Sequence, residues 1–223
     1  METPAWIDRL EDKIGGWSIP HMVRGLVVLN ALAFMLDMAS PGFTASLILD
    51  SAALHHGEWW RVVTFLFAAG GTTNSIGIFF FILWMMVTWM FGDGLEAAMG
   101  SFKVTLYLVI PVVLLTAVVW FYPWSGAGNS ILLVSLFFAF ATFYPDLELM
   151  LFFILPVKCK WLALLSAAFI LVQFIAAPHL RLMILASLST YFLFFLPGWW
   201  TRLRLRAEAR VRRGRFRRDD DDE

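Results

Sequence analysis

The sequence predicts an all-α membrane protein, and two observations support this prediction. Hydrophobic residues make up 60% of the 223-residue chain and charged residues 15%, against about 45–50% and about 25% in soluble domains. Charged residues are also missing from the long stretches 62–92, 104–145, 161–180 and 182–201. A membrane-spanning helix needs about 20 mostly apolar residues, so these stretches and the first apolar segment favour a bundle of six transmembrane helices.

The expected spans are 23–38, 76–91, 102–121, 129–144, 161–175 and 180–197. Most of them are short for a bilayer. The fourth lies between Gly128 and Pro145, which allows only about 25 Å of helix. Helices of this length predict either local thinning of the bilayer or burial inside the bundle.

The chain divides into a membrane domain, 21–200, and two polar ends. Segment 1–20 contains AWIDRLEDKI, in which Trp6, Leu10 and Ile14 recur at helical spacing. This pattern predicts an amphipathic helix on the membrane surface, with docking onto a partner as the alternative. Segment 201–223 carries nine arginines followed by acidic residues. It favours contact with anionic lipid; nucleic acid is not an expected partner.

The basic residues predict the orientation of the bundle. All of the 17 lysines and arginines except Arg61 and Arg181 fall on one side of the predicted spans. Because basic residues gather on the cytoplasmic side of membrane proteins, both termini are expected in the cytoplasm. The expected location is a plasma membrane, which in a bacterium is the inner membrane.

The first loop carries the motif WWR, composed of Trp59, Trp60 and Arg61. Tryptophan prefers the headgroup level of a bilayer, and an arginine beside it can stack its guanidinium on an indole ring. We expect the motif to anchor this loop in the outer leaflet.

A second motif follows the second span, where Phe91-Gly92 precedes Glu96 and Gly100. Gly92 and Gly94 are expected to allow a tight cytoplasmic turn. Glu96 is expected to cap backbone amides at a helix end or to pair with Lys103.

These motifs resemble those of the rhomboid superfamily, which includes intramembrane serine proteases and inactive, derlin-like relatives. The elements that match are Trp60-Arg61, Phe91-Gly92 with Glu96 and Gly100, and the block 145–161 with LPVKCKW. The resemblance covers roughly residues 20–200 and implies a rhomboid-like six-helix fold. It also implies a first loop that disturbs the surrounding lipid and positions membrane clients.

The family's proteolytic chemistry is only partly matched. Gly128-Asn129-Ser130 falls where the resemblance places the nucleophile, but the predicted sixth span contains no histidine. A serine hydroxyl is a weak nucleophile until a base accepts its proton. Counting back from Phe91-Gly92, the positions that the resemblance implies would assist the oxyanion are approximately Phe80 and Trp84. Neither side chain is suited to hydrogen-bond this charge.

Two alternatives remain for these residues. His179, or less readily His55 or His56, lies on the same side as Ser130 and could serve as an atypical base. Otherwise Ser130 is a helix-interior residue that bonds the carbonyl four residues earlier. The sequence contains no metal-spaced cluster of histidines and cysteines, so neither a metal nor another cofactor is expected.

The sequence therefore favours a pseudoprotease that binds membrane clients or lipids and perturbs the local bilayer. Its candidate contacts are Arg61 with its tryptophans, Asn129 and Ser130. The alternatives are an active rhomboid-type serine endopeptidase that uses Ser130, and a small-solute transporter. Transport is less favoured because Asp37 is the ionisable residue that comes nearest to a span interior, and such residues usually mark transport pathways.

Overall fold

The computed structural model describes residues 5–68, 74–122, 126–151, 155–196 and 198. Its α-helices are α1 (Ala5–Ile14), α2 (Met22–Ala39), α3 (Ser51–His55), α4 (Arg61–Thr64), α5 (Ser75–Met99), α6 (Ser101–Phe121), α7 (Ser130–Phe143) and α8 (Cys159–Ala176). A final helical segment, Pro178–Leu196, opens with the 3-10 turn η4 (Pro178–Leu180). The other 3-10 turns are η1 (Gly15–Trp17), η2 (Thr44–Ser46) and η3 (Phe65–Phe67).

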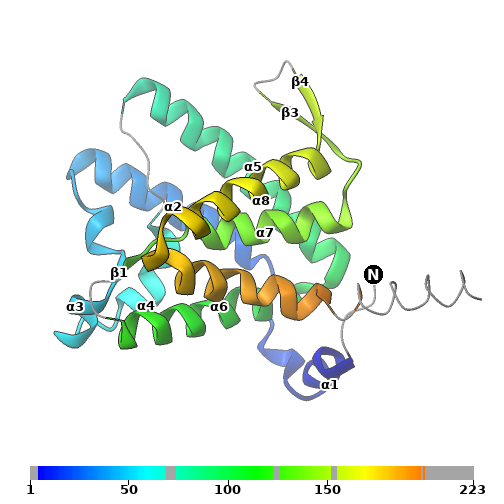
Figure 1. The fold of residues 1–223 in the computed structure, drawn as a ribbon, viewed down its shortest axis with the longest axis horizontal. Helices are drawn as coiled ribbons and strands as arrows, with labels where there is room; N and C mark the ends of the chain where they lie inside the picture. The colour runs from blue at the N-terminus through cyan, green and yellow to red at the C-terminus, as the bar shows by residue number, and fades with distance from the viewer. Residues whose placement is uncertain (1–4, 69–73, 123–125, 152–154, 197, 199–223) are drawn as a thin grey trace, which may run out of the picture.

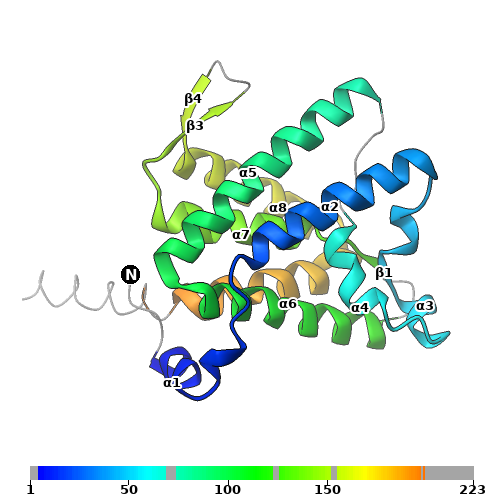
Figure 2. The same ribbon diagram turned by 180° about the vertical axis from the view of Figure 1, so that it is seen from behind.

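The long helices run between two recognisable ends of the molecule (Figure 1). We call one the hairpin end, because it carries α1 and the hairpin of β3 (Glu148–Leu151) and β4 (Leu155–Lys158). The other is the loop end, which carries α3, α4 and β1 (Leu49–Asp50). The view from behind gives the same arrangement (Figure 2).

The helices confirm an all-α membrane protein but not the full number of spans. Five helices are long and apolar enough to cross a membrane: α2, α5, α6, α8 and the final segment. The predicted fourth span, α7, is apolar but has only 14 residues. The predicted second span ends at 91, whereas α5 continues to Met99, about two further turns.

α7 is the centre of the bundle. Nine of its 14 residues are buried, and it packs against both α5 and α8. Polar contacts reach it from other helices, since the Tyr107 hydroxyl of α6 lies 2.8 Å from the Ser135 carbonyl oxygen. Thr142 Oγ1 lies 3.1 Å from the Tyr191 hydroxyl of the final helix. For this helix, burial inside the bundle accounts for the short length.

The described residues form two small strand pairs. β1 pairs antiparallel with β2 (Gly126–Ala127), with Leu49 opposite Ala127. This pair holds the first loop against the chain that leads into α7. The β3–β4 hairpin has Glu148 opposite Lys158. It was not predicted, because each strand is a charged residue beside a short apolar run and lacks the alternation of a half-buried strand.

The glycines of α5 do not make the predicted turn. A Cβ on Gly92 would collide with Val23 of α2, and one on Gly94 would lie 2.5 Å from Phe140 Cε2 of α7. Both residues are inside α5, where they allow close helix packing. The turn between α5 and α6 is made by Gly100, whose φ of +84° suits glycine.

The N-terminal segment forms the predicted helix, α1, and the helix docks on the bundle. Lys103 at the start of α6 lies 2.7 Å from Asp8 and 3.5 Å from Glu11, and Ile7 is completely buried. The predicted Glu96–Lys103 pair is therefore wrong, because Lys103 binds α1. The arginine-rich tail, 201–223, lies outside the described residues.

Candidate functional site

Ser130 lies at the loop end, where α7 begins. It is the first residue of α7 and its side chain is exposed, so the prediction of a helix-interior serine is wrong. Within the described ranges, no hydrogen bond joins its hydroxyl to a histidine or to any other acceptor. Gly128 is also exposed, and a Cβ there would lie at an ordinary 3.7 Å from the Ala68 carbonyl oxygen.

Asn129, immediately before Ser130, is buried in a polar node. Its Nδ2 donates to Asn30 Oδ1 and to the Leu66 carbonyl, each at 2.8 Å. Asn30 Nδ2 in turn donates to the carbonyls of Leu26 at 2.8 Å and Leu66 at 3.1 Å. Asn129 is only 2% exposed, so the expectation that it contacts clients is wrong. It fastens the start of α7 to α2 and to the end of the first loop.

The histidines are spread over the molecule. His179 is exposed in η4 and has no hydrogen bond or ion pair with another described residue. His55 stacks on Trp120 with ring centroids 4.5 Å apart, and its Nδ1 lies 2.8 Å from the Ser51 carbonyl oxygen. His21 is at the opposite end of the bundle, beside Glu96. None of these contacts brings an imidazole to Ser130.

The positions that the resemblance assigns to the base and to the oxyanion donors do not carry the side chains that the protease chemistry needs. On the final helix, the buried polar residues are Ser187 and Thr190, and neither can act as a general base at neutral pH. Phe80 and Trp84, the predicted oxyanion positions, are apolar residues on α5 with 46% and 38% exposure.

Arg61 fastens the first loop through oxygen atoms. Its Nε donates to Glu58 Oε2 at 2.6 Å, and its Nη1 donates to the carbonyls of Ala45 at 3.2 Å and Ile48 at 2.9 Å. The Arg61 side chain is 13% exposed. The predicted stacking of Arg61 on a tryptophan is wrong, because these oxygens bind its guanidinium.

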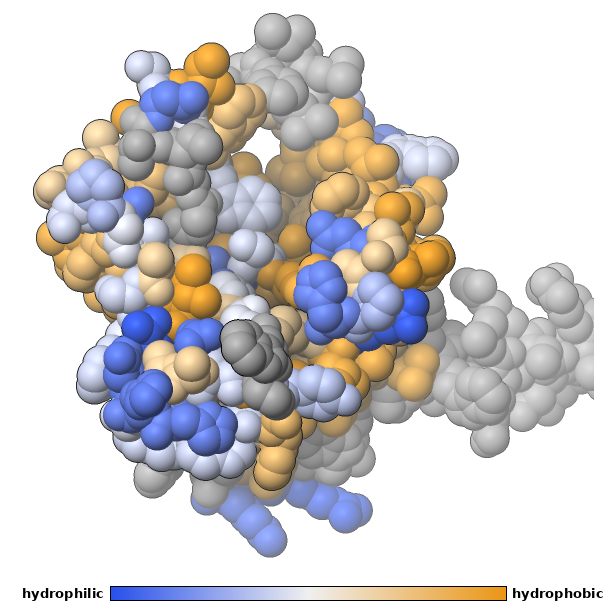
Figure 3. Space-filling view, turned by 60° about the vertical axis from the view of Figure 1, so that its left-hand side comes forward, coloured by the Kyte–Doolittle hydropathy of each residue, from blue (hydrophilic) through white to orange (hydrophobic). Residues whose placement is uncertain are grey.

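The tryptophans of the WWR motif lie on the surface of the loop end. Trp59 stacks on Trp120 of α6 at 5.1 Å between ring centroids, and Trp59 and Trp60 are 56% and 58% exposed. Polar side chains form separate patches on this side of the molecule, with apolar surface between them (Figure 3). Exposed indole rings beside polar groups suit the interface of a bilayer.

Glu96 caps the start of α2, as one of its predicted roles required. Its carboxylate accepts the His21 amide N–H at 3.0 Å, lies 3.2 Å from His21 Nδ1 and also accepts from the Ser101 hydroxyl. A negative group at a helix N-terminus is stabilising. Glu96 is therefore a structural residue that joins α2, α5 and α6.

An ion pair between α2 and α5 was missed by the sequence analysis. Arg24 donates to Asp93 through Nε at 2.7 Å and Nη2 at 3.0 Å. Trp89 also donates to Asp93, at 3.1 Å, and the Arg24 guanidinium lies 5.5 Å from the Trp89 ring centroid. The available signal was a pair of opposite charges at the ends of two neighbouring spans. The Asp93 carboxylate is therefore already paired with Arg24 when a partner approaches these helices.

Two apolar grooves lie along the bundle. The α5 groove, of about 970 Å³, is formed by α2, α5, α7 and Leu147, and includes Ile82, Met85, Met86 and Met90. The α8 groove, of about 830 Å³, is formed by α7, α8 and the final helix. Among the described residues, no group of three His, Cys, Asp or Glu side chains could hold a metal ion.

Comparison with known proteins gives no match. No family model fits the chain, and neither a curated protein nor a solved structure is significantly similar to it. The resemblance to rhomboids therefore stays a prediction from the motifs, and the proposed function depends on the geometry described above.

Proposed function

We propose that this protein is a rhomboid-like pseudoprotease of the membrane that binds hydrophobic clients without cutting them. The observation that carries the proposal is the Ser130 hydroxyl, which has no proton acceptor among the described residues. An alcohol without a base does not attack a peptide bond at a useful rate. Because Ser130 is exposed, a substrate could still reach its hydroxyl. An active endopeptidase is therefore the alternative that the tests below distinguish.

In this proposal the hairpin end faces the cytoplasm, and the protein is a multi-pass protein of a plasma membrane. Most lysines and arginines of the described bundle support this orientation. Arg24, Lys103 and Lys160 are in the first turns of α2, α6 and α8, and Lys158 ends β4, all at the hairpin end of these elements (Figure 1). Arg61 in α4 and Arg181 after η4 are at the loop end. The loop end then faces outward with Trp59 and Trp60 at the outer interface. An interfacial first loop favours a local disturbance of the bilayer around it.

The α5 groove is the proposed client site. Met85, Met86 and Met90 line it, and methionine side chains adapt to ligands of differing shape. Its apolar wall continues toward the loop end over exposed side chains of α5, including Ile76 and Phe79. α5 has 25 residues, a length of about 37 Å, so a spanning client helix can follow it across the hydrocarbon core.

Proteolysis is tested with the full-length protein in liposomes and a panel of single-span reporter peptides. We expect no cleavage and no covalent labelling of Ser130 by a fluorophosphonate. Turnover that disappears in Ser130→Ala would establish an active endopeptidase and refute the pseudoprotease. Loss of that turnover in His179→Ala would additionally identify the base.

Client binding is tested by energy transfer between the protein and a fluorescent single-span peptide in the same liposomes. We expect saturable transfer that Ile82→Trp weakens by tenfold or more, because Ile82 lines the α5 groove. Ile175→Trp is the matched control, since Ile175 is a similarly exposed isoleucine on α8, outside the α5 groove and its continuation along α5. Equal binding by both variants would remove the α5 groove as the client site.

A further inference from the structure

The α8 groove is a wedge between two consecutive helices. α8 and the final helix diverge from their junction at η4 toward the hairpin end (Figure 1). Its α8 wall consists of Lys160, Ala163, Leu164, Ala167, Ile170, Leu171 and Phe174. From Lys160 to Phe174 this wall is about 21 Å long.

The groove is closed at the loop end. Arg181, just after η4, donates through Nε to the Phe174 carbonyl at 2.9 Å, and its guanidinium lies 5.6 Å from the Phe174 ring centroid. The short connection and this contact block the narrow end of the wedge. A peptide that spans the membrane cannot pass through this blocked end. A hydrocarbon chain can enter the groove from the hairpin end and stop inside it.

The polar groups of the groove gather at its open end. Thr142, Tyr191 and Lys160 are its hydrogen-bonding or charged side chains, and the rest of the lining is apolar. Lys160 Nζ lies 2.8 Å from Asp146 Oδ1. The pKa of Asp146 is lowered by this hydrogen bond and by the charges of Lys160 and Lys158. Glu148 lies opposite Lys158 in the β3–β4 hairpin, so this end carries two lysines and two carboxylates.

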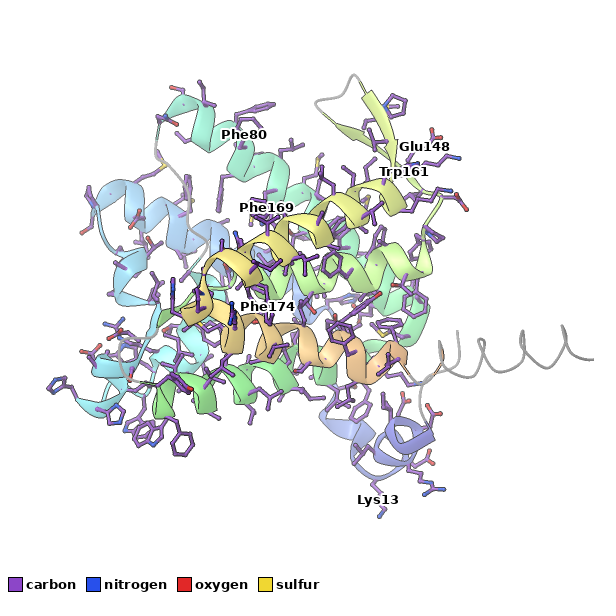
Figure 4. The ribbon with its side chains drawn as sticks, viewed as in Figure 1. Lys13, Phe80, Glu148, Trp161, Phe169 and Phe174 are labelled. Carbon is purple, nitrogen blue, oxygen red and sulfur yellow. The ribbon has the colours of Figure 1, made fainter. Side chains whose placement is uncertain are left out.

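The groove is also open along its side. Only Cys159 among the 18 residues of α8 is buried. Trp161 and Phe169 mark the outer face of this helix (Figure 4) and are 60% and 63% exposed. A lipid can therefore reach the groove directly from the bilayer.

We propose that the α8 groove binds an anionic phospholipid from the leaflet at the hairpin end, with an acyl chain along α8 and the phosphate near Lys158 and Lys160. Apolar walls, one closed end and an open end that carries two lysines and the hydroxyls of Thr142 and Tyr191 match an amphiphile of this kind. The chain also continues from this end of the final helix into a segment with nine arginines, which adds to the attraction of anionic headgroups. This lipid site goes beyond the proposed function, because it is separate from the client groove.

Native mass spectrometry of the full-length protein with phosphatidylglycerol or phosphatidylcholine tests the proposal. We expect one retained phosphatidylglycerol, bound at least tenfold more tightly than phosphatidylcholine. Ala167→Phe, which fills the groove, should lose this lipid. Ala168→Phe is the matched control, because the neighbouring Ala168 is exposed outside the groove. Lys160→Ala should weaken binding by about fivefold, as expected for one lysine near the surface.

Photolabelling of the unmodified protein gives a readout that no folding defect can imitate. A phosphatidylglycerol with a diazirine at the end of one acyl chain should label the closed end of the groove, at Ile170 or Phe174. Labelling confined to the outer face, at Phe169, Val172 or Ile175, would overturn the proposal. So would equal retention of both lipids, or equal lipid loss in the two alanine variants.

A competition experiment separates this site from the client site. The single-span peptide that binds the α5 groove should leave phosphatidylglycerol retention unchanged, and Ile82→Trp should not alter it. Displacement of the lipid by the peptide would assign the α8 groove to clients and refute the lipid site. Failure of client binding alone would leave the lipid result unaffected.

Discussion

α7 and α8 are both apolar helices, yet they have opposite surroundings. Nine of the 14 residues of α7 are buried, whereas one of the 18 residues of α8 is. The hydrophobicity of the sequence cannot tell a buried helix from a lipid-facing one. Lipid tails are as apolar as a protein core, so hydrophobicity does not drive helices together in a membrane. Their difference comes from close packing and polar contacts, which α7 makes with several helices and α8 makes sparingly.

The largest effect is expected from the same truncation in the two helices. Leu136→Ala in α7 removes a side chain that is 1% exposed and should lower the free energy of unfolding by about 2–4 kcal/mol through the cavity it leaves. Leu165→Ala in α8 removes a side chain that is 69% exposed and should change it by less than about 0.5 kcal/mol. Unfolding by sodium dodecyl sulfate in mixed micelles measures both. Similar losses would mean that α8 is packed as α7 is.

A matched pair of glycines sharpens the role of close packing. Gly92→Ala places a Cβ against Val23 and should destabilise the bundle by about 1–3 kcal/mol through overpacking. Gly25→Ala on α2 has nothing within 4 Å of the new Cβ and should leave stability unchanged or raise it by up to about 1 kcal/mol. The same mixed-micelle titration compares them. A tolerant Gly92 would show that α2 and α5 can separate at little cost.

The polar start of α7 should matter more than its exposed serine. Asn129→Ala leaves Asn30 Oδ1 without its donor and should cost about 1–2 kcal/mol, within the range for hydrogen bonds inside membrane proteins. Ser130→Ala removes an exposed hydroxyl without a described partner and should be neutral. Thermal unfolding in detergent gives both values. A large loss for Ser130→Ala would reveal a partner for this hydroxyl.

The polar start of α8 should have the smallest effect. Asp146 and Lys160 are 71% and 47% exposed, and exposed ion pairs contribute little. Because the pKa of Asp146 is lowered in the folded state by Lys160, its stabilisation is present above the ordinary aspartate pKa and lost as pH falls through the lowered pKa. We expect Asp146→Asn to abolish this small pH dependence without a measurable shift of the unfolding midpoint at pH 7. A clear shift at pH 7 would show that the pair holds α8 in place.

The sequence predicted the helices better than their contacts. Spans such as 23–38 and 102–121 match α2 and α6 within about one residue at each end, because long charge-free runs bounded by polar residues mark them. The positions of Gly92 and Gly94 inside α5 were not predictable, since a glycine suits both a turn and a close helix contact.

The candidate site was predicted in its residues but not in its bonds. The Trp60-Arg61 and Gly128-Asn129-Ser130 motifs located segments that the structure places at the same end of the bundle. Besides Glu58, the partners of Arg61 are backbone carbonyls, which any sequence supplies, so no pattern could reveal these two contacts. The contact of Asn129 with Asn30 joins residues 99 positions apart and depends on the tertiary fold.

The short η4 connection also constrains how the chain enters the bilayer. With three residues between Ala177 and Arg181, α8 and the last helix are too closely joined to integrate one after the other as independent segments. In the proposed topology, we expect them to insert as a single helical hairpin with His179 and Arg181 at its tip. The bond from Arg181 to the Phe174 carbonyl can form within that hairpin before any other part of the bundle is assembled.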